Sequence, residues 1–259
     1  MQDDDDDDNG DNNNAWKVLL MDKRYRYTTL TIWCLWGVYA TLYYGTIMAV
    51  TLVFSSSNSN NNNNSLDFDF GALVVAASAE IAGVTIVLHV VDRFGRIPSQ
   101  MFCFAMAGIS VLTLCLLKHH QQEENNHDGS SSSSGSSNSR IWLIFFGFAS
   151  RMFALSASNM VWMTTAEVLP TRVRTTGHGM ANAVARMGAF LAPYIVLSPK
   201  TPLVQTGWIL FACSILCVVC VSRLPETKHV PMGRAIDRTL SITVQDDENT
   251  TTTTTIITT

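Results

Sequence analysis

The sequence predicts an all-α membrane protein with six transmembrane helices. Of its 259 residues 47% are hydrophobic and only 15% are charged, and the charged residues lie almost entirely outside a set of long apolar runs. A helix needs roughly 20 apolar residues to cross a bilayer. Backbone groups in lipid must be hydrogen-bonded internally, which favours helices over loops in these runs.

Six apolar runs come close to this length or exceed it. We expect spans at residues 29–54, 70–91, 101–117, 141–169, 177–197 and 204–221. Together they form one six-span unit at residues 29–228. The flanking segments, 1–28 and 229–259, contain acidic or Thr-rich polar tracts that cannot form a core, so we expect both to be disordered.

The basic residues predict how the chain is oriented in the membrane. With these spans, 12 Lys and Arg residues lie on one side and 3 on the other, and the remaining two of the 17 lie within spans. An excess of Lys and Arg marks the cytoplasmic side. We therefore expect a multi-pass protein of the plasma membrane or a vesicle membrane, with both termini in the cytoplasm.

No pattern in the sequence indicates an enzyme, a cofactor or a nucleic-acid partner. The six cysteines all fall in apolar runs, where a free thiol packs as a small hydrophobic group. Histidine and acidic residues cluster at 119–128, but within a polar loop that is better interpreted as a solvated linker than as a metal site. We expect no bound metal, and the lipid bilayer is the expected surrounding.

Two arginines, Arg151 and Arg186, lie inside apolar spans. A guanidinium is costly to bury in hydrocarbon, so an ionisable residue at this depth indicates a functional site. Glu80 lies about ten residues from the outer end of its span, which at 1.5 Å per residue places it near mid-membrane. The three side chains could therefore meet.

Helical phase adds polar and aromatic neighbours to these charges. At about 100° per residue, Leu155, Ser158, Asn159 and Trp162 fall within a quarter turn of Arg151. Such a stripe should face water or the interior of the bundle. Four aromatic residues of the first span supply either an aromatic wall or packing and interfacial anchors, namely Trp33, Tyr39, Tyr43 and Tyr44.

The link between the second and third spans is short and charged. Asp92, Arg93 and Arg96 surround Gly95, which permits a tight turn, and Pro98 suits the first turn of the next helix. Spacing alone fits a basic cytoplasmic loop as well as a dedicated motif.

This link resembles the Asp-Arg-x-Gly-Arg loop in the C-terminal half of major facilitator superfamily carriers. Four further segments fit the organic ion transporter and synaptic-vesicle-type branch of that superfamily: YYG at 43–45, AEVLPTRVRTTG at 166–177, VARMGAFLAP at 184–193 and LPETK at 224–228. The resemblance implies the C-terminal six-helix half of a secondary carrier that works by alternating access.

The resemblance also implies roles for the charged residues. Asp92, Arg93 and Arg96 would pair with Glu167, Arg174 and Glu226 to latch the cytoplasmic helix ends when the carrier faces outward. Surface pairs of this kind contribute about 0.2 to 1 kcal/mol each, which suits a gate that opens repeatedly. The position of Arg186 is typically Arg in carriers of organic anions and Asp in carriers of organic cations.

Three interpretations of the charged trio stay open: a structural ion pair, a substrate site, and proton coupling through Glu80. The favoured function is transport of a small organic ion, preferably an anion. The expected substrate contacts are Arg186, Arg151, Glu80, Asn159, Trp162, Tyr43 and Tyr44. The alternatives are a proton-coupled sugar carrier and a non-transporting membrane scaffold or glycoprotein.

Carriers of this superfamily have 12 spans in two halves, with substrate bound between them. We expect this chain to supply only the second half. It would then be a piece of a longer product, a half that pairs with a missing N-terminal half or a second copy, or an inactive relic.

Overall fold

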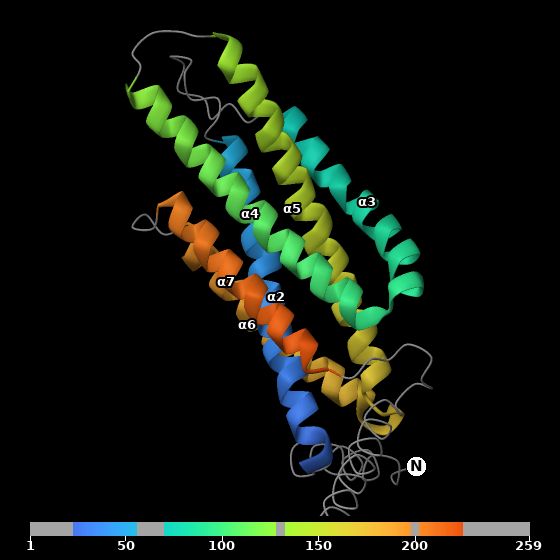
Figure 1. Ribbon diagram of the computed structural model, residues 1–259. Helices are drawn as coiled ribbons and strands as arrows, with labels where there is room; N and C mark the ends of the chain where they lie inside the picture. The colour runs from blue at the N-terminus through green and yellow to red at the C-terminus, as the bar shows by residue number, and fades with distance from the viewer. Residues whose placement is uncertain (1–22, 56–69, 128–132, 198–201, 225–259) are drawn as a thin grey trace, which may run out of the picture.

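The computed structural model describes residues 23–55, 70–127, 133–197 and 202–224. In these residues the regular structure consists of six α-helices (Figure 1). They are α2 (Lys23–Ser55), α3 (Phe70–Phe94), α4 (Arg96–His127), α5 (Ser133–Val168), α6 (Thr171–Val196) and α7 (Leu203–Ser222). The predicted all-α fold is confirmed for this part of the chain.

Several helices extend beyond the predicted spans. α2 begins at Lys23, inside the segment that we expected to be disordered. α4 continues to His127 and α5 begins at Ser133, so most of the expected polar loop between them is helical, which corrects that prediction. Hydropathy detects only the apolar part of a helix, whereas a helix can continue into water through polar turns.

Four of the described helices are long and apolar enough to cross a membrane. The apolar segments are Arg26–Phe54, Arg96–Gln121, Ile141–Val168 and Leu203–Ser222. α6 is more polar because His178, Asn182 and Arg186 interrupt its apolar residues. The spans expected within α3 and α6 stay predictions.

The helices run alternately up and down, with α2 packed in the middle of the bundle (Figure 1). α2 contacts α5, α6 and α7, while α4 packs between α5 and α7. α3 packs mainly on α5, and α6 packs mainly on α2. The start of α2, the α3–α4 link, the α5–α6 link and the end of α7 therefore lie at one end of the bundle.

Apolar side chains of α2 form the centre of the core. Ile32, Leu35 and Trp36 are fully buried, together with Phe104 of α4 and Leu210 of α7. A second, smaller cluster surrounds Val50, Phe54 and Leu143 toward the opposite end of the bundle.

Backbone geometry at two links explains why the helices turn where they do. Gly95, between α3 and α4, has φ = 101°, a conformation that strains any residue with a side chain. Pro170 occupies the N-cap of α6, directly after α5 ends at Val168, because proline tolerates the start of a helix but not its interior. These links hold the charged residues near the helix ends.

Candidate functional site

Glu80 and Arg151 form an ion pair between α3 and α5. Arg151 Nη2 lies 2.6 Å from Glu80 Oε1, and the two side chains are 11% and 39% exposed, respectively. The short distance and the limited exposure indicate a charge-assisted hydrogen bond that largely neutralises both groups.

A close crossing of the two helices positions this pair. The Ser156 hydroxyl of α5 donates to the Gly83 carbonyl of α3 at 3.0 Å. A Cβ at Gly83 would lie 2.8 Å from the Met152 carbonyl oxygen, so only glycine permits this approach. Glu80 lies one turn before Gly83, and Arg151 lies beside Met152, so the crossing brings their side chains together.

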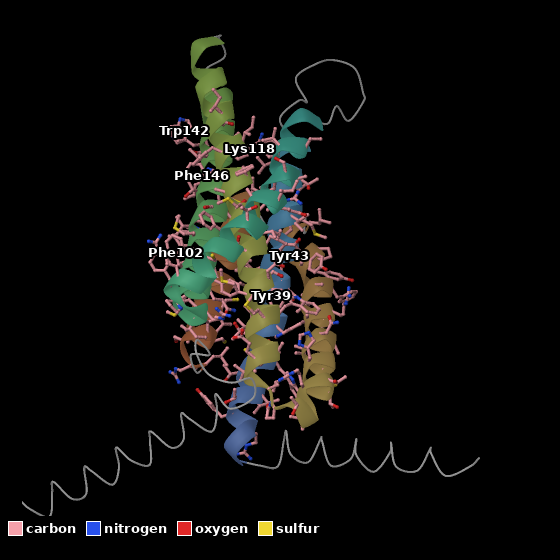
Figure 2. All side chains as sticks on the ribbon, turned by 90° about the vertical axis from the view of Figure 1, so that its right-hand side faces the viewer. Tyr39, Tyr43, Phe102, Lys118, Trp142 and Phe146 are labelled. Atoms are coloured by element: carbon pink, nitrogen blue, oxygen red, sulfur yellow. The ribbon has the colours of Figure 1, made fainter. Side chains whose placement is uncertain are left out.

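Tyr43 of α2 lies beside the ion pair. Its hydroxyl is near enough to Glu80 and Arg151 to interact electrostatically with both. Tyr43 also contacts Tyr44 edge to face, with ring centroids 5.3 Å apart. Figure 2 shows Tyr39 and Tyr43 on the same stretch of α2, in the middle of the bundle.

Arg186 lies on α6, which packs closely against α2. A Cβ at Gly188 would collide with the Gly37 carbonyl, and Thr41 Oγ1 donates to both the Gly37 and Gly188 carbonyls at 3.0 Å. This contact places Arg186 near Tyr39, whose hydroxyl is close enough to interact with the guanidinium electrostatically.

Among the described residues, no hydrogen bond or ion pair of Arg186 is present, and the guanidinium is exposed. It lines an open cavity of about 360 Å³ with Met187, Phe190 and Leu191. The trio expected from sequence is therefore divided in the described structure: Glu80 and Arg151 contact each other, and Arg186 lies apart from them.

The polar stripe on α5 lies between these two positions. Ser158 is buried, Asn159 is partly buried, and Trp162 is 42% exposed. Tyr39 of α2 hydrogen-bonds to both Ser158 and Trp162. α2 thus links the stripe on α5 to Arg186 on α6.

Sequence reasoning did not select Trp36 and His178 as members of this region. Trp36 is completely buried, and its Nε1 donates to Thr165 Oγ1 at 2.9 Å. Residues 36, 39 and 43 share one helical face through their i, i+3 and i+7 spacing, so this signal was available in the sequence. The position of His178 depends on how α6 docks and had no such signal.

At the other end of the site, Arg96 and Glu167 connect the start of α4 to the end of α5. The Arg96 Nε and Nη2 atoms lie 3.4 and 3.3 Å from Glu167 Oε1. Arg174 Nε instead donates to the Leu169 carbonyl at 3.3 Å, across the α5–α6 link. The Arg93 side chain is exposed, and the Asp92 side chain and Glu226 lie outside the described residues.

The family model for sugar (and other) transporters matches residues 1–235. The chain belongs to this transporter family. The match confirms the predicted resemblance to major facilitator carriers, and several relatives support the predicted branch.

Synaptic vesicle 2-related protein from Xenopus laevis is 26% identical over 226 residues, covering 81% of this chain and 38% of the relative. Putative transporter svop-1 from Caenorhabditis elegans is 27% identical, covering 81% of this chain and 39% of the relative. The Organic cation transporter protein from Drosophila melanogaster is 27% identical over 63% of this chain. The chain thus spans about two fifths of the length of the first two relatives.

Solved structures show the same fold. The crystal structure of a D-xylose-proton symporter matches with a TM-score of 0.54 at 16% identity, over 86% of this chain and 52% of the symporter. The six helices therefore correspond to about half of a major facilitator carrier, as predicted.

Proposed function

We propose that the protein takes part in transport of a small organic anion across a membrane by alternating access, with Arg186 as the principal substrate contact. The family match supports a transporter. The arrangement of charges around α2 supports the choice of an anion. Asn159, Trp162, Tyr43 and Tyr44 would complete the site from α5 and α2.

The observation that carries this proposal is the difference between the two arginines. Arg151 is neutralised by Glu80, whereas Arg186 is an exposed cation beside a cavity, without a carboxylate partner among the described residues. An isolated charge at bilayer depth requires water or a counterion. A planar guanidinium fork binds carboxylates in a bidentate manner, so an organic carboxylate fits the vacancy of charge.

The Glu80–Arg151 pair would then support the site without binding the anion directly. It fixes α3 against α5 and keeps a second positive charge from competing for substrate. Glu80 is partly exposed and remains the candidate proton site if transport is proton-coupled.

The cytoplasmic latch is part of the same proposal. Asp92, Arg93, Gly95, Arg96, Glu167, Arg174 and Glu226 would form it, and the Arg96–Glu167 contact is its described part. The side that carries most Lys and Arg residues, including this latch, would face the cytoplasm.

A carrier needs a counterpart to the surface that holds Arg186. The missing N-terminal half of a carrier, encoded in the same or another chain, or a second copy would supply the opposite wall of the path. The coverage of about two fifths of the relatives motivates this part of the proposal.

Uptake into proteoliposomes tests the substrate class. We expect accumulation of labelled organic carboxylates, a loss of at least about tenfold in apparent affinity for Arg186→Ala, and a smaller loss for Arg186→Lys, which keeps the charge but not the fork. Arg223→Gln is the matched control, because it removes an exposed arginine that contacts Tyr27 at the end of the bundle. Unchanged anion uptake in Arg186→Ala would exclude Arg186 from the site.

A proton-coupled sugar carrier is the second candidate. The family description and the hydroxyl and amide groups of Tyr39, Ser158 and Asn159 favour it, since such groups bind uncharged hydroxyl-rich ligands. The same vesicles distinguish the candidates: sugar uptake driven by a proton gradient and insensitive to Arg186→Ala would support the sugar carrier. Uptake of neither class by a correctly inserted chain would favour the non-transporting scaffold.

A further inference from the structure

Three aromatic rings from three helices meet on the side of Arg186 that faces the α5–α6 link. We call Trp36 of α2, Trp162 of α5 and His178 of α6 the aromatic trio. The centroids of Trp36 and Trp162 lie 4.8 Å apart, and the His178 ring lies 4.9 Å from each of them. Each ring therefore contacts both of the others.

The indoles of the trio are held in place by other groups. Trp36 is completely buried and donates its Nε1 hydrogen to Thr165 at 2.9 Å. Trp162 hydrogen-bonds with Tyr39, which also packs edge to face on Trp36 with centroids 5.6 Å apart. His178 thus docks onto a preformed aromatic surface made by α2 and α5.

The trio lies where α6 meets α5. α6 packs along α2 but has only a small contact with α5. Trp162 belongs to the stripe on α5, and Arg186 lies eight residues after His178, about 12 Å along the helix. The contact of His178 with Trp162 therefore closes the gap between α5 and α6 on the link side of Arg186.

Of the three rings, only histidine gains a proton near neutral pH. A neutral imidazole packs against an indole as an aromatic ring, whereas an imidazolium is also attracted to the indole π-face. Two indoles contact His178, so protonation should strengthen the contact from both sides.

The charged and titratable groups on the packed elements leave this role to the indoles. On α5, Glu167 is engaged by Arg96, and on α6, Arg174 lies one turn before His178 and donates to the Leu169 carbonyl. Arg186 lies two turns beyond, and on α2 the neighbouring titratable groups are Tyr39 and Cys34. None of the described carboxylates is paired with His178.

We propose that His178 is a proton-binding residue whose protonation locks α6 against α5 and closes the path to Arg186 from the side of the α5–α6 link. Acid on that side would hold the carrier closed there, and loss of the proton would allow α6 to move away. The consequence for transport rests on the function proposed above, but proton binding and the locking of α6 do not.

Tryptophan fluorescence of the full chain in lipid nanodiscs tests proton binding directly, because an imidazolium quenches a neighbouring indole more strongly than an imidazole does. We expect fluorescence to fall on acidification with a midpoint within about one unit of pH 6.5. The transition should disappear in His178→Gln and shrink in Trp162→Phe. His119→Gln, on α4 at the opposite end of the bundle, should leave it unchanged.

Persistence of the transition in folded His178→Gln, or its absence from the wild-type chain, would overturn the proposal. Circular dichroism establishes whether the variant is folded. Should it not fold, the histidine resonances of the wild-type chain answer the same question: a ring that titrates and broadens the Trp162 indole signal supports the proposal, and a His178 ring that does not titrate contradicts it.

Thiol accessibility tests the locking of α6. A cysteine at Asn159, in a background without the native cysteines, is modified by an impermeant reagent from the link side at pH 5.5 and pH 7.5. Because thiol ionisation also changes with pH, the rate is divided at each pH by that of the same cysteine in His178→Gln. We expect this ratio to fall about three- to tenfold at acid pH.

The two proposals fail in different ways. A chain that moves no anion but keeps the His178-dependent quenching and the accessibility change loses the proposed transport function and retains the proton site. A chain that transports anions while both readouts are insensitive to His178 retains the transport function and contradicts this inference.

Discussion

The two membrane arginines show how one residue type acquires different roles from its neighbours. Arg151 faces a carboxylate at 2.6 Å, and Arg186 faces a cavity and the hydroxyl of Tyr39. Their apolar sequence contexts are similar, so the difference arises from the helices against which α5 and α6 pack. α5 packs on α3, which carries Glu80, whereas α6 packs on α2, which carries tyrosines.

The ion pair should contribute measurably to stability. Glu80→Gln removes the partner of an arginine that is 11% exposed, and we expect a loss of about 2 kcal/mol, intermediate between exposed and fully buried pairs. Thermal unfolding in detergent measures it. The exchanged pair Glu80→Arg with Arg151→Glu should recover part of the loss, and strictly additive single effects would show that the two side chains do not interact.

Residue-level prediction from sequence succeeded in part. Helical phase placed Asn159 and Trp162 on the face of α5 that meets α2, because phase depends only on the helix itself. The distance between Arg186 and Glu80 could not be obtained in this way, since similar depth in the bilayer does not fix the rotation of two separate helices.

Among the helices, α6 depends most on a single close contact. Gly188 lies against the Gly37 carbonyl, and Thr41 bridges the two backbones. Pro193, one turn later, cannot donate a backbone hydrogen bond, which weakens the continuity of the helix beyond this point. The contact with α2 therefore holds α6 and sets the position of Arg186.

Substitution of Gly188 tests this dependence. Gly188→Ala should destabilise the protein by about 1–3 kcal/mol because neither backbone can yield easily, and it should displace Arg186 from Tyr39. Gly179→Ala on the same helix is the matched control: a Cβ there meets nothing within 4 Å, so alanine should stabilise the helix by up to about 1 kcal/mol. Chemical or thermal unfolding of both variants provides the comparison, and equal effects would contradict the packing argument.

At the scale of the whole molecule, the Arg96–Glu167 contact joins the starts and ends of helices at the basic end of the bundle. Both side chains are partly exposed, at 22% and 16%, so the pair is a modest tether and not a permanent lock. A weak tether is suited to a bundle that changes conformation repeatedly.

Breaking the tether should shift the conformational population slightly. For Arg96→Gln or Glu167→Gln we expect a shift of about 1.4- to 5-fold toward the state open at that end, which corresponds to 0.2–1 kcal/mol. The labelling rate of a cysteine at the exposed Ala183 reports this shift. Glu123→Gln, at the opposite end of α4, serves as the control, and no difference between the variants would remove the latch role.

Membrane insertion and a six-helix fold follow from the sequence alone, because long apolar runs have few stable alternatives in lipid. The turn at Gly95 and the start of α6 after Pro170 were also readable, since glycine and proline restrict or permit backbone angles locally. The polar helix ends around His127 and Ser133 were not, because their hydropathy resembles that of a loop.

The tertiary structure alone decided which polar groups meet. It paired Glu80 with Arg151, left Arg186 beside a cavity, and brought His178 between two tryptophans of other helices. The physical reason is that such contacts depend on the rotation and crossing of packed helices. Those are fixed by contacts such as Gly83 with Met152 and Gly188 with Gly37, whose members are far apart in the chain.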